Sequence, residues 1–118
     1  MRATPGNYPH HPMPETRAQL SFNRTLDEPQ YLALIHGKIP RAPDDHWFIF
    51  EDDDWVSLHR SATGVCIFKL RLEDAGDEWQ VAEAWANRDP DQYNSGDDEA
   101  DTQMLERLLD QLIESNGR

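Results

Sequence analysis

The densest group of polar side chains in the chain is one short run, His59-Arg60-Ser61-Ala62-Thr63-Gly64. An imidazole, a guanidinium and two hydroxyl groups beside a glycine are typical of a turn that cradles a phosphate or carboxylate, because such a turn exposes backbone N–H groups. Serine, threonine and glycine are also ordinary turn residues, so a purely structural hairpin tip is the competing interpretation. The run is not a Walker loop, since it lacks a second glycine, a suitably placed lysine and a following helix.

Other chemistry finds less support in the spacing of residues. Ser57 and Ser61 lie near His59, but no nucleophile elbow surrounds them. A calcium loop with Gly96 at its sixth position would place Tyr93 where an oxygen ligand belongs. Cys66 is flanked by apolar residues in an apolar segment, which favours a buried, unreactive thiol. The sequence therefore predicts no catalytic residue, metal site or cofactor, and favours a binding protein over an enzyme.

The elements that position these residues begin with residues 46–72, where apolar and polar residues alternate as in a three-strand antiparallel meander. We predict three-residue hairpin loops at 52–54 and 62–64, with Gly64 in the left-handed conformation. One face of the meander is then apolar and forms the main core, with residues Phe48, Phe50, Val56, Leu58, Cys66, Phe68, Leu70 and Leu72. The opposite face is mixed, with residues Trp47, Ile49, Glu51, Trp55, Ser57, His59, Val65, Ile67, Lys69 and Arg71.

The mixed face is the candidate binding surface. In this register, Trp47 lies beside His59 and Ile67, while Trp55 lies between Glu51 and Arg71. Tryptophan rings beside cations can hold an anionic ring compound or form the hot spot of a protein interface. The alternative is that the first helix or the amino-terminal strand covers these tryptophans. The candidate ligand- or partner-binding residues are Trp47, Trp55, His59, Arg60, Ser61, Thr63 and Arg71.

The remaining elements complete an α+β fold. A short strand is expected around Leu20 and Phe22 and a fourth meander strand from Trp79 to Asn87, in which Glu83 either pairs with a basic residue or has a perturbed pKa. Asp27 and Gln30 predict a capping box for a first helix that ends at Gly37, with Tyr31, Leu32, Leu34 and Ile35 facing inward.

A second helix is expected from about residue 98 to 114, with its leucine stripe over the sheet. The predicted fold is therefore an antiparallel four- to five-stranded meander packed by two helices, the second at the C-terminus. Residues 1–14 contain four prolines and are expected to form a flexible arm, followed by a single domain at 15–118.

The charge of the chain is strongly negative, with 11 Lys and Arg against 23 Asp and Glu and a formal charge of −12. Such a charge repels nucleic acids and anionic membranes and favours a basic protein partner. Sixteen of the acidic residues lie in the segments 44–54, 73–78 and 89–101, which are expected to be loops. These are either ordinary solvated connections or one acidic surface, depending on whether the loops converge in space. With one cysteine and no signal peptide or long apolar run, we expect a cytoplasmic protein.

The segment around the hairpin resembles a family of small bacterial proteins of unknown function that share an H-R-S-x-T-G core. The similar residues include Trp47, Glu51, Trp55, the run from His59 to Gly64, and Cys66-Ile67-Phe68. The resemblance spans roughly residues 46–93, with Asn87-Arg88-Asp89 and Tyr93 near its end. It implies that the hairpin is a coherent unit and implies no activity.

Three functions are compatible with the sequence. The first is a small acidic cytoplasmic interaction protein that binds a basic partner, as an immunity protein, antitoxin or inhibitor does. The second is a module that binds a nucleotide or another anion at the mixed face and the hairpin. The third is an enzyme that uses Glu83 or His59 as a general base. A homodimer formed through a strand edge or the tryptophan face is compatible with each of them.

Overall fold

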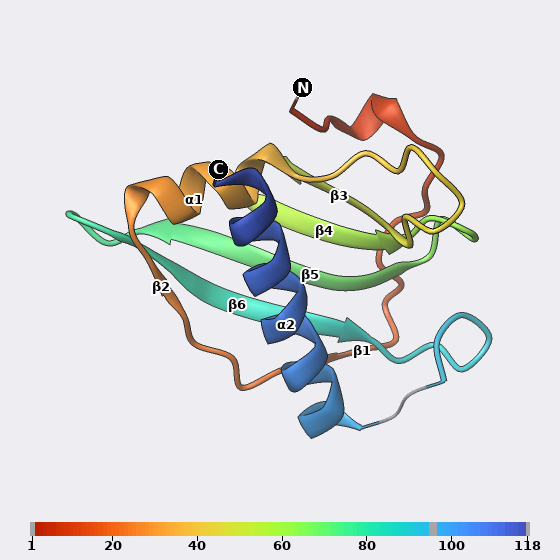
Figure 1. Ribbon diagram of the computed structural model, residues 1–118. Helices are drawn as coiled ribbons and strands as arrows, with labels where there is room; N and C mark the ends of the chain where they lie inside the picture. Colours follow the sequence, from red (N-terminus) through yellow and green to blue (C-terminus); the bar gives the residue numbers. More distant parts are fainter. Residues whose placement is uncertain (1, 95–96, 118) are drawn as a thin grey trace.

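A six-stranded antiparallel sheet forms the centre of the protein (Figure 1). The computed structural model describes residues 2–94 and 97–117. The strands are β1 (Arg17–Gln19), β2 (Thr25–Leu26), β3 (Trp47–Asp52), β4 (Trp55–Arg60), β5 (Cys66–Asp74) and β6 (Trp79–Asn87), in the spatial order β1-β6-β5-β4-β3, with β2 also paired to β6. Helices α1 (Glu28–His36) and α2 (Asp98–Asn116) cover one face. The predicted α+β class, meander and C-terminal helix are confirmed. The single strand expected around Leu20 and Phe22 is wrong: the amino-terminal segment contributes two short strands, β1 before these residues and β2 after them.

Helix α1 begins and ends at the predicted residues. The Asp27 carboxylate accepts a hydrogen bond from the Gln30 backbone N–H at 2.9 Å, and the Gln30 side chain accepts one from the Asp27 N–H at 3.1 Å. Gly37 ends the helix with φ of 72°, and a β-carbon there would lie 2.2 Å from the carbonyl oxygen of Ile49. Glycine therefore lets the chain pass directly against β3. Leu32, expected on the inner side, is instead 53% exposed.

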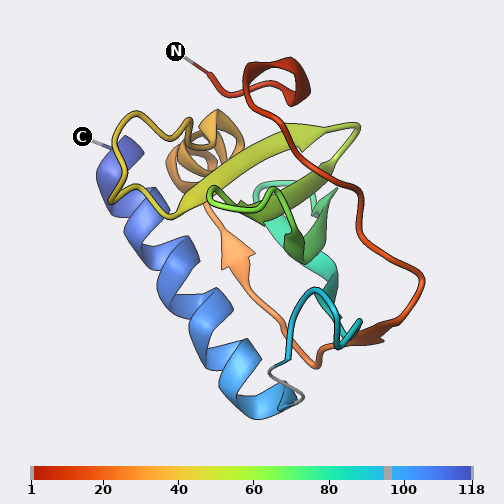
Figure 2. The same ribbon diagram turned by 90° about the vertical axis from the view of Figure 1, so that its right-hand side faces the viewer.

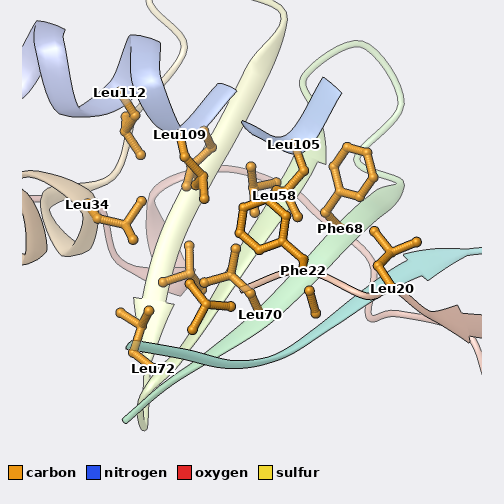
Figure 3. Packing of buried hydrophobic residues seen from close by; sticks show 14 of the residues in the cluster. Leu20, Phe22, Leu34, Leu58, Phe68, Leu70, Leu72, Leu105, Leu109 and Leu112 are labelled. Atoms are coloured by element: carbon orange, nitrogen blue, oxygen red, sulfur yellow. The ribbon is translucent and has the colours of Figure 1, made fainter. Parts of the chain in front are cut away.

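Helix α2 covers the sheet through the predicted leucine stripe, with Leu105, Leu109 and Leu112 buried against the strands (Figure 3). Ala84 and Ala86 of β6 belong to the same core, where their small side chains leave room for the helix. At the end of α2, the Asn116 amide donates to the carbonyl oxygens of Ala33 and Gly37 at 3.0 and 2.9 Å. This side chain fastens the ends of the two helices together.

The predicted hairpin loop at 52–54 is one residue too long. Asp52 pairs with Trp55, so Asp53 and Asp54 alone form the turn, with φ of 53° and 69°. Positive φ at both central residues is the type I′ geometry that matches the twist of paired strands. Because of this shift of one residue, each side chain of β3 points to the opposite face of the sheet from the one predicted.

As a result, Ile49 lies opposite Leu58 and faces the helices, while Phe48 and Phe50 lie opposite His59 and Ser57. The prediction that Phe48 and Phe50 face the main core is wrong. The predicted position of Ile67 on the mixed face is also wrong. A bulge between Leu58 and His59 pairs Cys66 with His59 and places Ile67 in the main core beside Phe68.

The amino-terminal segment covers the two phenylalanines that the turn exposes. Ala3, 1% exposed, packs with Phe48, Phe50 and the ring of Tyr8 in a second small core. Backbone hydrogen bonds fix the segment at both ends: the Ala3 N–H donates to His36 O and the His11 N–H donates to Gly64 O, each at 2.8 Å. Figure 2 shows this segment on the side of the sheet away from α2. Its expected flexibility stays a prediction.

The turn geometry predicts opposite effects for one substitution at neighbouring positions. A residue with a side chain is strained at positive φ, and glycine is not. Asp54→Gly should therefore raise the free energy of unfolding by about 0.5–1 kcal/mol. Asp52→Gly removes the same charge from a strand residue and should lower it by a similar amount. Urea unfolding monitored by circular dichroism measures both. Equal destabilisation by the two changes would contradict a two-residue turn.

Candidate functional site

The sheet face away from the helices carries two tryptophans with a cation over each ring. We define the open face as Arg17, Trp55, Lys69, Arg71, Glu83 and Trp85. Trp55, Arg71 and Glu83 form one cross-strand row, Lys69 pairs with Trp85 in the next, and Arg17 of β1 reaches the Trp85 ring. The Lys69 ammonium lies 5.2 Å from the centre of the Trp55 ring, and the Arg17 guanidinium lies 5.1 Å from that of Trp85. These side chains are half-buried except for the exposed Arg17. The open face is therefore an aromatic surface that already interacts with cations.

Glu83 is paired rather than free. Its carboxylate accepts a hydrogen bond from Arg71 at 2.7 Å and another from the Trp85 indole at 3.3 Å. The hydrogen bond from Arg71, followed by that from Trp85, lowers the pKa of Glu83 below its usual value. The carboxylate is thus held ionised in an ion pair, which gives it no role as a general base of raised pKa.

Beside the open face, the amino-terminal segment and the sheet enclose a hollow of about 380 Å³, which we call the arm pocket. Its lining residues are His10, Pro12, Met13, Phe50, Asp52, Asp53, Trp55, Ser57, His59, Cys66 and Lys69. His59 is 1% exposed and stacks on Phe50, with ring centres 5.3 Å apart, while the edge contact of His10 brings the two imidazoles to 4.9 Å. The imidazole of His59 is therefore a packing group of this pocket.

Burial controls the protonation of the two buried groups in the arm pocket. The pKa of His59 is lowered from 6.5 to about 4, chiefly by loss of solvation; nearby His10 also lowers it, while the hydrogen bond of Nδ1 with the Phe48 carbonyl, 3.3 Å away, opposes the shift. Burial also raises the pKa of the Cys66 thiol to about 12. His59 is consequently neutral at pH 7, and Cys66 is a protonated thiol as its apolar neighbours predict.

The polar groups of the predicted anion-binding hairpin mostly form hydrogen bonds within the chain. The Ser61 hydroxyl donates to Asp45 O at 2.6 Å, and the carbonyl of Ser61 accepts from the Tyr8 hydroxyl at 3.0 Å. The Thr63 hydroxyl oxygen accepts from the Val65 N–H at 3.3 Å. Gly64 has the expected positive φ, of 75°, and its N–H donates to Arg60 O. The structural interpretation of the hairpin accounts for these contacts.

The structure separates the seven predicted site residues into three places. Trp55 and Arg71 are cross-strand partners on the open face, as predicted, with His59 nearby in the arm pocket. Trp47 and Arg60 lie on the helix side of the sheet, where the guanidinium sits 5.3 Å from the centre of the indole ring. Ser61 and Thr63 remain in the loop between β4 and β5. The predicted row that joins Trp47, His59 and Ile67 is wrong because of the shorter turn and the bulge.

Acidic residues of two of the three segments converge at one end of the sheet, whereas Asp44 and Asp45 precede β3 at the opposite end. The β3–β4 turn and the β5–β6 turn lie at the same end (Figure 1), and the Leu72 N–H donates to Asp54 O at 2.8 Å. We call the carboxylates gathered there the acidic end: Glu51, Asp52, Asp53, Asp54, Glu73, Asp74, Asp77 and Glu78. Residues 89–94 and 97–101 lie at the other end of the sheet, beside the start of α2.

Carboxylates from both turns of the acidic end act on the same side chain, Tyr31. Tyr31, whose ring stacks on Trp79 with centres 3.8 Å apart, has its pKa raised first by burial and then by the charges of Glu51, Asp54 and Asp74, which come from both turns. Among the described residues, Glu51 is the only one of the eight acidic residues with an ion pair, to Arg2. The acidic end thus presents concentrated negative charge to solvent.

No protein-family model, curated protein or solved structure matches the chain. Only the geometry of its own residues therefore bears on its function. In the described parts of the chain, no three or more His, Cys, Asp and Glu side chains are grouped to hold a metal ion; Gly96, the centre of the calcium loop considered above, lies outside them. Likewise, none of the described helices combines the length and apolarity needed to cross a membrane.

Sequence reasoning missed some contributors to these surfaces. Trp85 joins the open face because β6 pairs with β5 in a register that sets Trp85 opposite Lys69 and Glu83 opposite Arg71. Arg17 joins it because β1 pairs with β6, the edge strand of the meander. Neither pairing has a local signal in the sequence, because both depend on contacts between distant segments.

The buried His59 predicts a specific dependence of stability on pH. The unfolded imidazole, with a pKa near 6.5, binds a proton before the folded one, whose pKa is about 4. The free energy of unfolding should therefore be unaffected by this residue above pH 6.5 and should fall by up to about 3 kcal/mol as the pH drops from 6.5 to 4.

The difference in unfolding free energy between the native protein and a His59→Phe variant isolates this effect, because both share the same carboxylates. The matched control is His46→Phe, which makes the same substitution at an exposed position. Urea unfolding from pH 4 to pH 7.5 provides the measurement. A constant difference for His59→Phe would show that the imidazole is not buried in its neutral form.

Proposed function

We propose that this protein is a small cytoplasmic interaction protein that binds a basic protein partner through its acidic end, in the manner of an immunity protein, antitoxin or inhibitor. The observation that carries the proposal is the convergence of the two acidic turns, since seven of the eight carboxylates of the acidic end have no ion pair among the described residues. Concentrated charge of one sign accelerates association with an oppositely charged surface and sets its orientation.

Trp55 would be the central aromatic contact of this interface, and the carboxylates of the acidic end would form its charged rim. It follows the Asp53-Asp54 turn directly, and its ring borders the arm pocket together with Asp52 and Asp53. Interfaces gain most of their affinity from a few buried aromatic or arginine residues, while charged rims contribute mainly to association rate and selectivity. An arginine of the partner placed on the Trp55 ring would replace Lys69 there and pair with the neighbouring carboxylates.

The alternative proposal, anion binding at the mixed face and the hairpin, finds less support. Its residues lie on opposite faces of the sheet, and the hydroxyl groups of Ser61 and Thr63 are engaged within the fold. Catalysis by His59 or Glu83 loses its basis as well, because the first is covered by the amino-terminal segment and the second is paired with Arg71.

Removing charge from the acidic end should weaken partner binding. The test retrieves basic proteins on the immobilised chain, identifies one, and measures its dissociation constant by calorimetry. Replacement of Asp52, Asp53, Asp77 and Glu78 by their amides should raise the dissociation constant at least tenfold in low salt and reduce its dependence on salt.

The matched control replaces four exposed acidic residues elsewhere, Glu15, Asp91, Glu99 and Glu106, by their amides. It has the same net charge and should change the dissociation constant less than threefold. Equal losses from both variants would reduce the proposal to a general charge effect, and retention of no basic protein by the native chain would overturn it.

Trp55→Ala should separate the aromatic contact from the charge. We expect the dissociation constant of the same partner to rise by ten- to a hundredfold, mainly through faster dissociation, because a central aromatic anchor contributes after the encounter. Surface plasmon resonance resolves the two rates. An unchanged dissociation rate, with folding verified by circular dichroism, would place Trp55 outside the interface.

A further inference from the structure

A separate hollow lies on the helix side of the sheet, where the end of α1, the following connector and the last turns of α2 meet the beginning of β3. It encloses about 310 Å³, at the lower end of the range for small-molecule pockets, about 300–1,000 Å³. Ile49 and Leu112, 2% and 4% exposed, line it together with the half-buried Trp47 and Leu108. This part of the wall is apolar and includes one aromatic ring.

The charge of the lining is the reverse of that of the chain. No aspartate or glutamate lines the hollow, whereas Lys38 and Arg41 both do. Asp45 lies near and partly offsets them: its carboxylate is 3.6 Å from the Lys38 ammonium and accepts from the Arg41 backbone N–H at 2.9 Å. Two cations and one carboxylate leave a local excess of one positive charge in a chain of formal charge −12.

Arg41 is distinctive among the basic residues. In the part of the chain that the structure describes, its guanidinium has no ion pair and no ring contact, as is also true of Arg107 on the exposed surface of α2. Arg41 differs from Arg107 in that it lines the hollow. Its five donors are therefore available beside an apolar wall, which is the arrangement that recognises a carboxylate, sulfonate or phosphate.

The walls of the hollow are held in place before any ligand arrives. Gly37 passes against the Ile49 carbonyl so closely that a β-carbon would not fit, and the Asn116 amide joins the last turn of α2 to Gly37. A site whose walls are already fixed loses less entropy when it binds. Its position at the first residue of β3, away from the Asp53-Asp54 turn, also separates it from the acidic end.

From these observations we propose that the hollow is a binding site for a small organic anion. An apolar ring or branched chain of the ligand lies against Trp47 and Leu108, and its single anionic group is held by the guanidinium of Arg41 with help from Lys38. The site goes beyond the proposed partner binding and shares no residue with the acidic end.

A pair of fluorescent probes tests the proposal. The anion 8-anilinonaphthalene-1-sulfonate should bind the folded protein saturably with one site per chain, and Arg41→Gln should raise its dissociation constant about tenfold. The neutral analogue N-phenyl-1-naphthylamine lacks the sulfonate, and its dissociation constant should change less than twofold. Arg107→Gln, the matched control, should leave both dissociation constants unchanged.

Filling the hollow gives the second arm of the test. Ser115→Trp introduces a large side chain from an exposed position on α2 and should abolish the saturable binding of both probes, with Gln111→Trp as a second blocking variant if the first is poorly folded. Circular dichroism verifies folding. Absence of saturable sulfonate binding, or equal effects of Arg41→Gln and Arg107→Gln, would overturn the proposal without bearing on partner binding.

Discussion

The backbone conformation of two aspartates determines how the rest of this molecule is assembled. Because Asp53 and Asp54 both take positive φ, the β3–β4 turn has two residues, and Ile49 rather than Phe48 faces the helices. The phenylalanines left on the other face then need a cover of their own. The amino-terminal segment provides it through Ala3 and Tyr8, and the arm pocket with its buried His59 exists as a consequence.

The same turn brings negatively and positively charged side chains close together. It gathers carboxylates beside those of the β5–β6 turn, and it places Trp55 at the boundary between that negative surface and the cations of the open face. On the helix side, the register brings Trp47 to the hollow lined by Lys38 and Arg41. The protein thus carries acidic residues at both ends of the sheet and a small positive site on the helix side.

Much of this architecture could be predicted from local sequence. Asp27, Gln30 and Gly37 carry the cap and the end of α1, and the leucine stripe identifies the buried side of α2, because these signals depend on neighbours within one or two turns of helix. The register of β3 could not be predicted, since three consecutive aspartates suit a two-residue or a three-residue turn. Contacts between distant segments produce the bulges, the pairing of β1 with β6 and the convergence of the acidic turns. The residues of the candidate surfaces could therefore be predicted only in part. The sequence predicts the pairing of Trp55 with Arg71 correctly but assigns Trp47 to the wrong face of the sheet.

The four tryptophans have sharply different neighbours, which gives the protein a built-in set of optical reporters. Trp79 stacks on Tyr31 of α1, Trp85 lies under Arg17 of β1, Trp55 lies under Lys69 and Trp47 lies under Arg60 beside the end of α2. Indole emission depends on nearby charge and solvent, so variants that retain one tryptophan each would give separate spectroscopic signals for these four regions. Detachment of a helix or of an edge strand would then be visible as a local event, distinguishable from loss of the whole fold.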